Sequence, residues 1–83
     1  MNPGDEVAQI VRRNLRLAED HPLPGDLSFA DGLGADSILV MGILVRVEET
    51  FGIELTAESV TRSDTLDGLV HEVERALAAA GRR

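Results

Sequence analysis

The strongest constraint on the fold is the unbroken apolar run ILVMGILV at residues 38–45. Taken alone, it could be a buried strand, because a short run of this kind does not reveal its period. The residues that follow favour a helix, since Ile43 and Val47 lie on one helical stripe and Gly52 is a typical residue just after a helix end. We therefore predict a helix over residues 37–51.

The same run has more apolar side chains than one helix face can bury. The buried stripe of an amphipathic helix covers roughly a third of its circumference, so eight consecutive apolar or glycine positions cannot all face inward. Some of the side chains of Leu39, Val40, Met41 and Val45 must then lie in solvent. Apolar side chains contribute most at the centre of a small interface, so we expect this face to dock partner proteins.

Apolar residues also recur at helical spacing near both ends of the sequence, which predicts helices over residues 5–20 and 65–79. Ser63 or Asp64 could cap the first turn of the second of these helices. The residues that define the two stripes are Val7, Ile10, Val11, Leu15 and Ala18, and then Leu66, Leu69, Val70, Val73 and Leu77.

Thr56 can cap a short fourth helix over residues 57–61. Each of the four segments has one apolar face, and such helices are stable only when those faces pack together. We therefore predict an all-α fold, a small four-helix bundle of three main helices and one short helix.

Residues 21–36 are too rich in proline and glycine for regular structure, yet they contain several apolar side chains, including Phe29. We expect a long loop that packs onto the core. Loops longer than about 12 residues are uncommon in compact domains and are usually functional. This loop leads directly into the apolar run.

Length and charge narrow the possible partners. The chain has 83 residues, with 15 acidic and 8 basic side chains and a net charge of −7. Half of such a chain could not bury enough apolar surface to fold, so we expect one domain over residues 1–83. We also expect the protein to be a monomer. Excess carboxylates repel phosphate backbones and anionic lipids, so neither nucleic acid nor a membrane is an expected partner. A basic protein surface is favoured.

The sequence contains no cysteine, which excludes disulfides, a thiolate nucleophile and a cysteine zinc site. His21 and His71 are the only histidines, and the carboxylates match no calcium-loop spacing, so we expect no metal site. The first residues lack the features of a signal peptide, and no apolar run approaches the roughly 18 residues of a membrane span. We expect a cytoplasmic protein.

Ser37 stands where the long loop becomes the predicted helix, directly after the acidic cap candidate Asp36. The first N–H groups of a helix are unpaired and its dipole is positive there, so an anion esterified to this serine would be stabilised. No histidine lies near Ser37 in the sequence to activate it as a nucleophile. A phosphate ester fits the position, and a second enzyme would have to attach it.

With these residues the sequence resembles the acyl carrier protein family over nearly its whole length. The resemblance rests on LGADSI at residues 33–38, which opens the second main helix, and on EETFGI at residues 48–53, which closes it. It implies that Ser37 carries 4′-phosphopantetheine, attached by a phosphopantetheinyl transferase. The thiol of that arm would hold acyl groups as thioesters, and Asp36 would cap the helix and help the transferase recognise it. The protein would be a carrier and not an enzyme.

Two departures from the family pattern affect the expected partners. Ile38 replaces the usual leucine, and Leu39 and Gly42 stand where fatty-acid carriers commonly have acidic residues. We therefore expect a carrier in a specialised pathway, such as a polyketide or hybrid aminoacyl system, rather than in housekeeping fatty acid synthesis. Its partners would be an acyl-loading enzyme, a ketosynthase or an acyltransferase. The expected docking residues are Ile38, Leu39, Met41, Val45, Glu48 and Glu49.

Two other readings of the sequence remain open. A peptidyl or aminoacyl carrier would have the same fold and a different cargo. An unmodified helical interaction module would use Ser37 only as part of a helix start, since many helices begin with such a residue. Modification of Ser37 separates the module from the carriers, and the preferred donor separates the two carriers.

Overall fold

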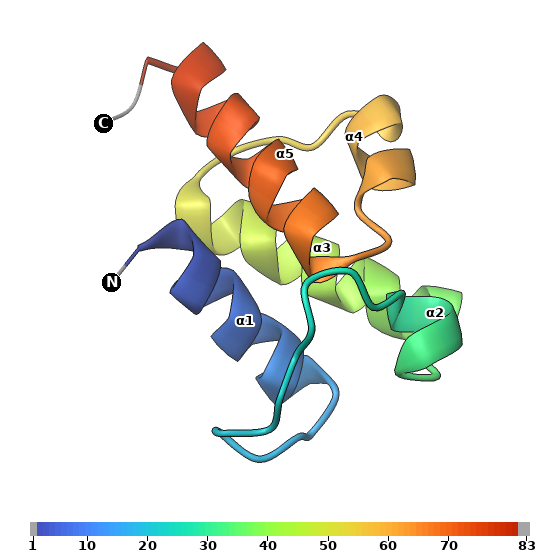
Figure 1. The fold of residues 1–83 in the computed structure, drawn as a ribbon. Coiled ribbons are helices and arrows are strands. Elements are labelled where there is room, and N and C mark those ends of the chain that lie inside the picture. Colours follow the sequence, from blue (N-terminus) through green and yellow to red (C-terminus); the bar gives the residue numbers. More distant parts are fainter. Residues whose placement is uncertain (1, 82–83) are drawn as a thin grey trace.

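A computed structural model describes residues 2–81 and contains five helices within them. They are α1 (Pro3–Asn14), α2 (Phe29–Gly32), α3 (Ser37–Phe51), α4 (Ala57–Arg62) and α5 (Leu66–Ala79). Figure 1 shows α1, α3 and α5 as the long elements of the bundle, with α2 and α4 at its periphery. The predicted all-α fold is confirmed, and within residues 2–81 no helix is both long and apolar enough to cross a membrane.

The core is aliphatic apart from one buried aromatic ring, that of Phe29. It forms where α1 packs against α3 and α5, and α2 closes one end against α3. Its buried members are Val7, Ile10, Val11, Phe29, Ala35, Ile43, Leu44, Val47, Ile53, Leu69 and Val73.

Helix α1 is shorter than the predicted helix over residues 5–20, and that prediction is wrong at its C-terminal end. Arg16 takes the left-handed conformation, with φ of 59°, and the N–H of Leu17 donates to the carbonyl of Arg12 at 2.8 Å. This pattern closes a helix end and is usually built with glycine. The apolar spacing therefore continues past the point where the backbone leaves the helix.

The segment between α1 and α3 is held to the start of α5. The N–H of Phe29 donates to the carbonyl of Asp64 at 2.7 Å, and the N–H of Asp67 donates to the carbonyl of Gly25 at 2.9 Å. The prediction that residues 21–36 lack regular structure is wrong in one place, because Ser28 caps the single helical turn α2. The turn places the Phe29 ring in the core.

Helix α3 begins and ends as predicted from the sequence. The carboxylate of Asp36 accepts a hydrogen bond from the N–H of Leu39 at 2.9 Å at its start, and Gly52 follows its last turn with φ of 66°. The side chains of Ile43, Leu44 and Val47 are buried.

The two glycines of this region should respond in opposite ways to replacement by alanine. Gly42 lies inside α3, and an added Cβ there would meet only the Asn14 side chain at an ordinary 3.7 Å, so G42A should stabilise the fold by up to about 1 kcal/mol. Gly52 has positive φ, so G52A should destabilise the fold by about 1–2 kcal/mol. Urea unfolding measures both changes. Shifts of the same sign in the two variants would contradict this account.

Helix α4 has no fully buried residue, and it contributes only the partly buried Val60 to the edge of the core. The Ser59 hydroxyl donates to the buried carboxylate of Glu72 at 2.7 Å. That hydrogen bond, assisted by the nearby positive charge of Arg75 and opposed by burial, lowers the pKa of Glu72. Helix α4 is therefore packed less deeply than the long helices α1, α3 and α5, each of which has buried residues.

The predicted cap of the last helix is wrong, because Thr65, and not Ser63 or Asp64, accepts the N–H of Gly68 and caps α5. The Ser63 hydroxyl is buried and donates to a carbonyl of α4 at 2.6 Å. The Asp64 carboxylate accepts a hydrogen bond from the Ser28 hydroxyl at 2.7 Å. Both candidate side chains thus form other hydrogen bonds, Ser63 at the end of α4 and Asp64 with the residue that caps α2.

Candidate functional site

Ser37 is the first residue of α3, and its side chain is exposed. The other three serines, Ser28, Ser59 and Ser63, each donate a hydroxyl hydrogen bond within the protein. Among residues 2–81 no such partner is found for the Ser37 hydroxyl. It is therefore the serine whose oxygen is accessible and uncommitted, as a group that accepts a covalent attachment must be.

The backbone around Ser37 fits an anion. The N–H of Leu39 donates a hydrogen bond to the Asp36 carboxylate. The N–H groups of Ser37 and Ile38, in contrast, have no hydrogen-bond partner within the described chain. Unpaired N–H groups at the start of a 15-residue helix, together with the positive end of its dipole, stabilise a phosphate esterified there. The residues present thus fit the phosphate end of a phosphopantetheine group.

The residues before Ser37 fix its position relative to the core. The N–H of Ala35 donates to the carbonyl of Phe29 at 2.9 Å, and the Ala35 side chain is buried. Between these residues the chain turns at Gly34, which has φ of 68°. This anchor does not follow from the apolar spacing of the sequence, although a serine three residues before Asp31 is a capping pattern that indicates α2.

The four apolar docking candidates on α3 are all exposed. The exposed fractions are 80% for Ile38, 41% for Leu39, 50% for Met41 and 48% for Val45. They lie on the first three turns of α3, beginning next to Ser37, with Ile38, Met41 and Val45 on one stripe and Leu39 about 100° around the helix from Ile38. We call these four side chains the α3 apolar face.

The two acidic docking candidates are in different environments. The Glu48 carboxylate accepts a hydrogen bond from the N–H of Leu55 at 2.9 Å and is half-buried, so it supports the loop between α3 and α4. Glu49 is exposed. Of this pair, Glu49 is the side chain that a partner can contact freely. Within residues 2–81 no group of three or more histidine or acidic side chains could hold a metal ion.

Fold and site together define a small helical domain with an uncommitted serine at the start of a long helix. The family model for a phosphopantetheine attachment site matches residues 5–73. Among curated relatives, a chloroplastic acyl carrier protein of Brassica napus is 31% identical over 75 residues, which is 90% of this chain and 55% of the relative. Acyl carrier protein 3 of Ralstonia nicotianae is 34% identical over 78 residues, and the match covers 90% of each chain.

Two solved structures share the fold. The solution structure of a holo acyl carrier protein from Geobacter metallireducens superposes with a TM-score of 0.80 at 21% identity, covering 96% of this chain and 91% of that one. The solution structure of oxytetracycline acyl carrier protein superposes with a TM-score of 0.75 at 22% identity, covering 93% and 83%. The chain spans about half the length of the chloroplastic relatives and most of the length of the Ralstonia protein.

The chain belongs to the acyl carrier protein family. Members of this family are carriers without catalytic activity of their own, and their cofactor is covalently attached 4′-phosphopantetheine. When attached, that group supplies the thiol that holds an acyl chain as a thioester. The protein's own residues at the start of α3, with two unpaired N–H groups, would hold the phosphate end of such a group.

Proposed function

We propose that Ser37 is the attachment residue and that the chain carries acyl groups in a specialised biosynthetic pathway, such as polyketide assembly. The attachment rests on the geometry already described: an exposed serine with an unengaged hydroxyl beside two unpaired backbone N–H groups. Asp36 would contribute by capping α3 and by presenting a carboxylate to the phosphopantetheinyl transferase.

The α3 apolar face carries the proposal of a specialised role. The four exposed apolar side chains, which extend over three turns of α3 from the attachment serine, would bind an enzyme surface that is itself apolar at its centre. The exposed carboxylate of Glu49 lies farther along the same helix and would meet a basic group at the rim. Charge would then govern the rate of encounter, and the apolar contacts would govern how long the complex lasts. An acyl-loading enzyme, a ketosynthase or an acyltransferase is the expected partner.

Replacing Met41 or Val45 with glutamate is expected to slow acyl transfer by the pathway enzymes at least about tenfold, because a charge would be buried at the centre of the interface. Both side chains are half exposed, so α3 should remain folded. Steady-state rates of acyl transfer, measured with the enzymes whose genes neighbour the gene for this protein, test the effect. Ala78→Glu adds the same charge on an exposed position of α5 and should leave the rate unchanged. Equal rates for all three variants would show that the docking surface lies elsewhere.

A peptidyl or aminoacyl carrier is the second candidate, because the same fold and attachment serve both cargoes. Loading the modified protein with matched acyl and aminoacyl donors, each with its own loading enzyme, separates the two. Faster loading from the acyl donor supports the proposal, and faster loading from the aminoacyl donor contradicts it.

A further inference from the structure

The arginines of this acidic chain fall into two groups. Six lie among residues 2–81, and two of them, Arg62 and Arg75, form ion pairs with carboxylates on their own helices. The remaining four have no ion pair with a carboxylate of the described chain. Arg12 and Arg13 lie on α1, Arg16 follows α1, and Arg46 lies on α3.

Two of these unpaired arginines line a groove of about 550 Å³ between α1 and α3, which we call the α1–α3 groove. Arg13 reaches it from α1, and Arg46 from α3. Gln9, Asn14 and Thr50 add polar side chains to its lining. Its single carboxylate among the described residues is that of Glu6, about two helical turns from Arg13 along α1.

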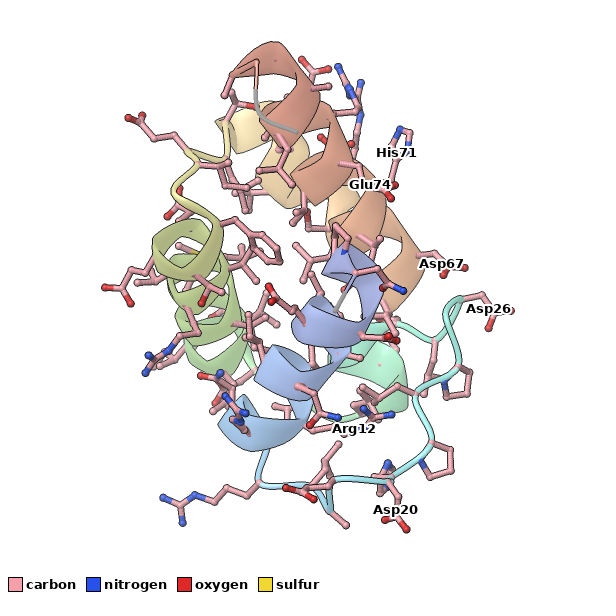
Figure 2. All side chains as sticks on the ribbon, turned by 90° about the vertical axis from the view of Figure 1, so that its left-hand side faces the viewer. Arg12, Asp20, Asp26, Asp67, His71 and Glu74 are labelled. Carbon is pink, nitrogen blue, oxygen red and sulfur yellow. The ribbon has the colours of Figure 1, made fainter. Side chains whose placement is uncertain are left out.

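Several acidic side chains lie on the side of the molecule away from the groove. Figure 2 shows Asp26, Asp67 and Glu74 on the α5 side of the view, across α1 from α3. The guanidinium of Arg12 is committed, since its Nε donates to the carbonyl of His21 at 2.8 Å. The charged groups that line the α1–α3 groove are two guanidinium groups and one carboxylate, so its lining is net positive on a chain whose net charge is −7.

We propose that the α1–α3 groove docks a short acidic segment of a partner protein, one that presents at least two aspartate or glutamate side chains. Guanidinium groups bind carboxylates through two parallel hydrogen bonds, and both Arg13 and Arg46 are exposed and unpaired. A polyanion such as nucleic acid would be repelled by the surrounding carboxylates, whereas a short peptide can place its charges within the groove alone.

This inference goes beyond the carrier role, because the groove is separate from the attachment serine. Arg46 lies nine residues after Ser37 in α3, which is about 14 Å along the helix axis. The two surfaces could thus be contacted by different parts of one enzyme or by two enzymes. The groove would select partners by an acidic segment, in addition to the apolar contacts beside Ser37.

The test is a titration of the ¹⁵N-labelled protein with a hexaglutamate peptide at low salt, followed by amide chemical shifts. Shifts are expected in the second halves of α1 and α3, and the Kd should rise at least about fivefold in the R13Q/R46Q double variant. The A57E/A78E double variant is the matched control, because it changes the net charge by the same two units at exposed positions of α4 and α5 and should change the Kd by less than about twofold.

Three results would overturn the proposal. Equal weakening in the control would show that only the overall charge matters. Shifts centred on Arg62 or Arg75 would place the binding surface at α4 and α5. If inorganic phosphate produced the same shifts and displaced the peptide at equal concentration, the groove would be a site for small anions. Both substituted arginines are exposed, so the dispersed spectrum of a folded protein should persist in the double variant.

Discussion

Ser37→Ala should abolish phosphopantetheinylation completely. The wild-type protein, incubated with coenzyme A and a broad-specificity phosphopantetheinyl transferase, should gain the mass of one phosphopantetheine group, and the variant should gain none. The reason is chemical, because the ester bond needs the serine oxygen and no substitute for it lies at the start of α3. Intact-mass spectrometry after the incubation measures the result.

Ser28→Ala is the appropriate control for this experiment. Ser28 also begins a helix, but its hydroxyl is bonded to Asp64 and caps α2. Its loss should cost about 1 kcal/mol of stability and leave the mass gain intact. A mass gain that persists without the Ser37 hydroxyl, or that disappears with the Ser28 hydroxyl, would contradict the assignment. No gain in the wild-type protein would favour the unmodified interaction module.

Phe29→Ala is expected to have the largest effect on stability, a loss of about 3–5 kcal/mol in the free energy of unfolding. The Phe29 ring is 1% exposed and is the one aromatic group buried in the core. Its removal leaves a cavity at the point where the loop, α2 and α3 meet. A loss of that size is a large part of the total for a domain of this length, so partial unfolding at 25 °C is expected.

Urea unfolding of this variant beside Phe51→Ala provides the comparison. Phe51 is only partly buried at the end of α3, so its removal should cost clearly less. Equal losses would show that the loop contributes little to the core. Because the Phe29 backbone also accepts the N–H of Ala35, a repositioned α2 should in addition slow modification of Ser37.

The sequence was sufficient to predict what depends on periodicity and on strong end signals. The first and last residues of α3 could be predicted because Asp36 is a typical residue before a helix and Gly52 a typical residue after one. The exposure of Met41 and Val45 could be predicted because the apolar run has more side chains than one helix face can bury. Ser37 could be found because a serine at such a boundary has a clear electrostatic consequence.

What could not be predicted depends on unusual local conformations and on contacts between distant segments. The end of α1 is set by a left-handed Arg16, a conformation that a non-glycine sequence rarely signals. Thr65 caps α5, because the two other candidates form different hydrogen bonds. The Ser63 hydroxyl donates to a carbonyl of α4, and the Asp64 carboxylate accepts a hydrogen bond from Ser28. The grouping of unpaired arginines depends on how α1 lies against α3.

The shallow packing of α4 gives the molecule two levels of local stability. A helix held by buried apolar side chains can leave the core only by exposing them to water, which is costly. Helix α4 contributes only the partly buried Val60 to the core, and one hydrogen bond, from Ser59 to Glu72, joins it to α5. We therefore expect α4 to open at a lower free energy than α1, α3 and α5, which faster hydrogen exchange of its amides would reveal.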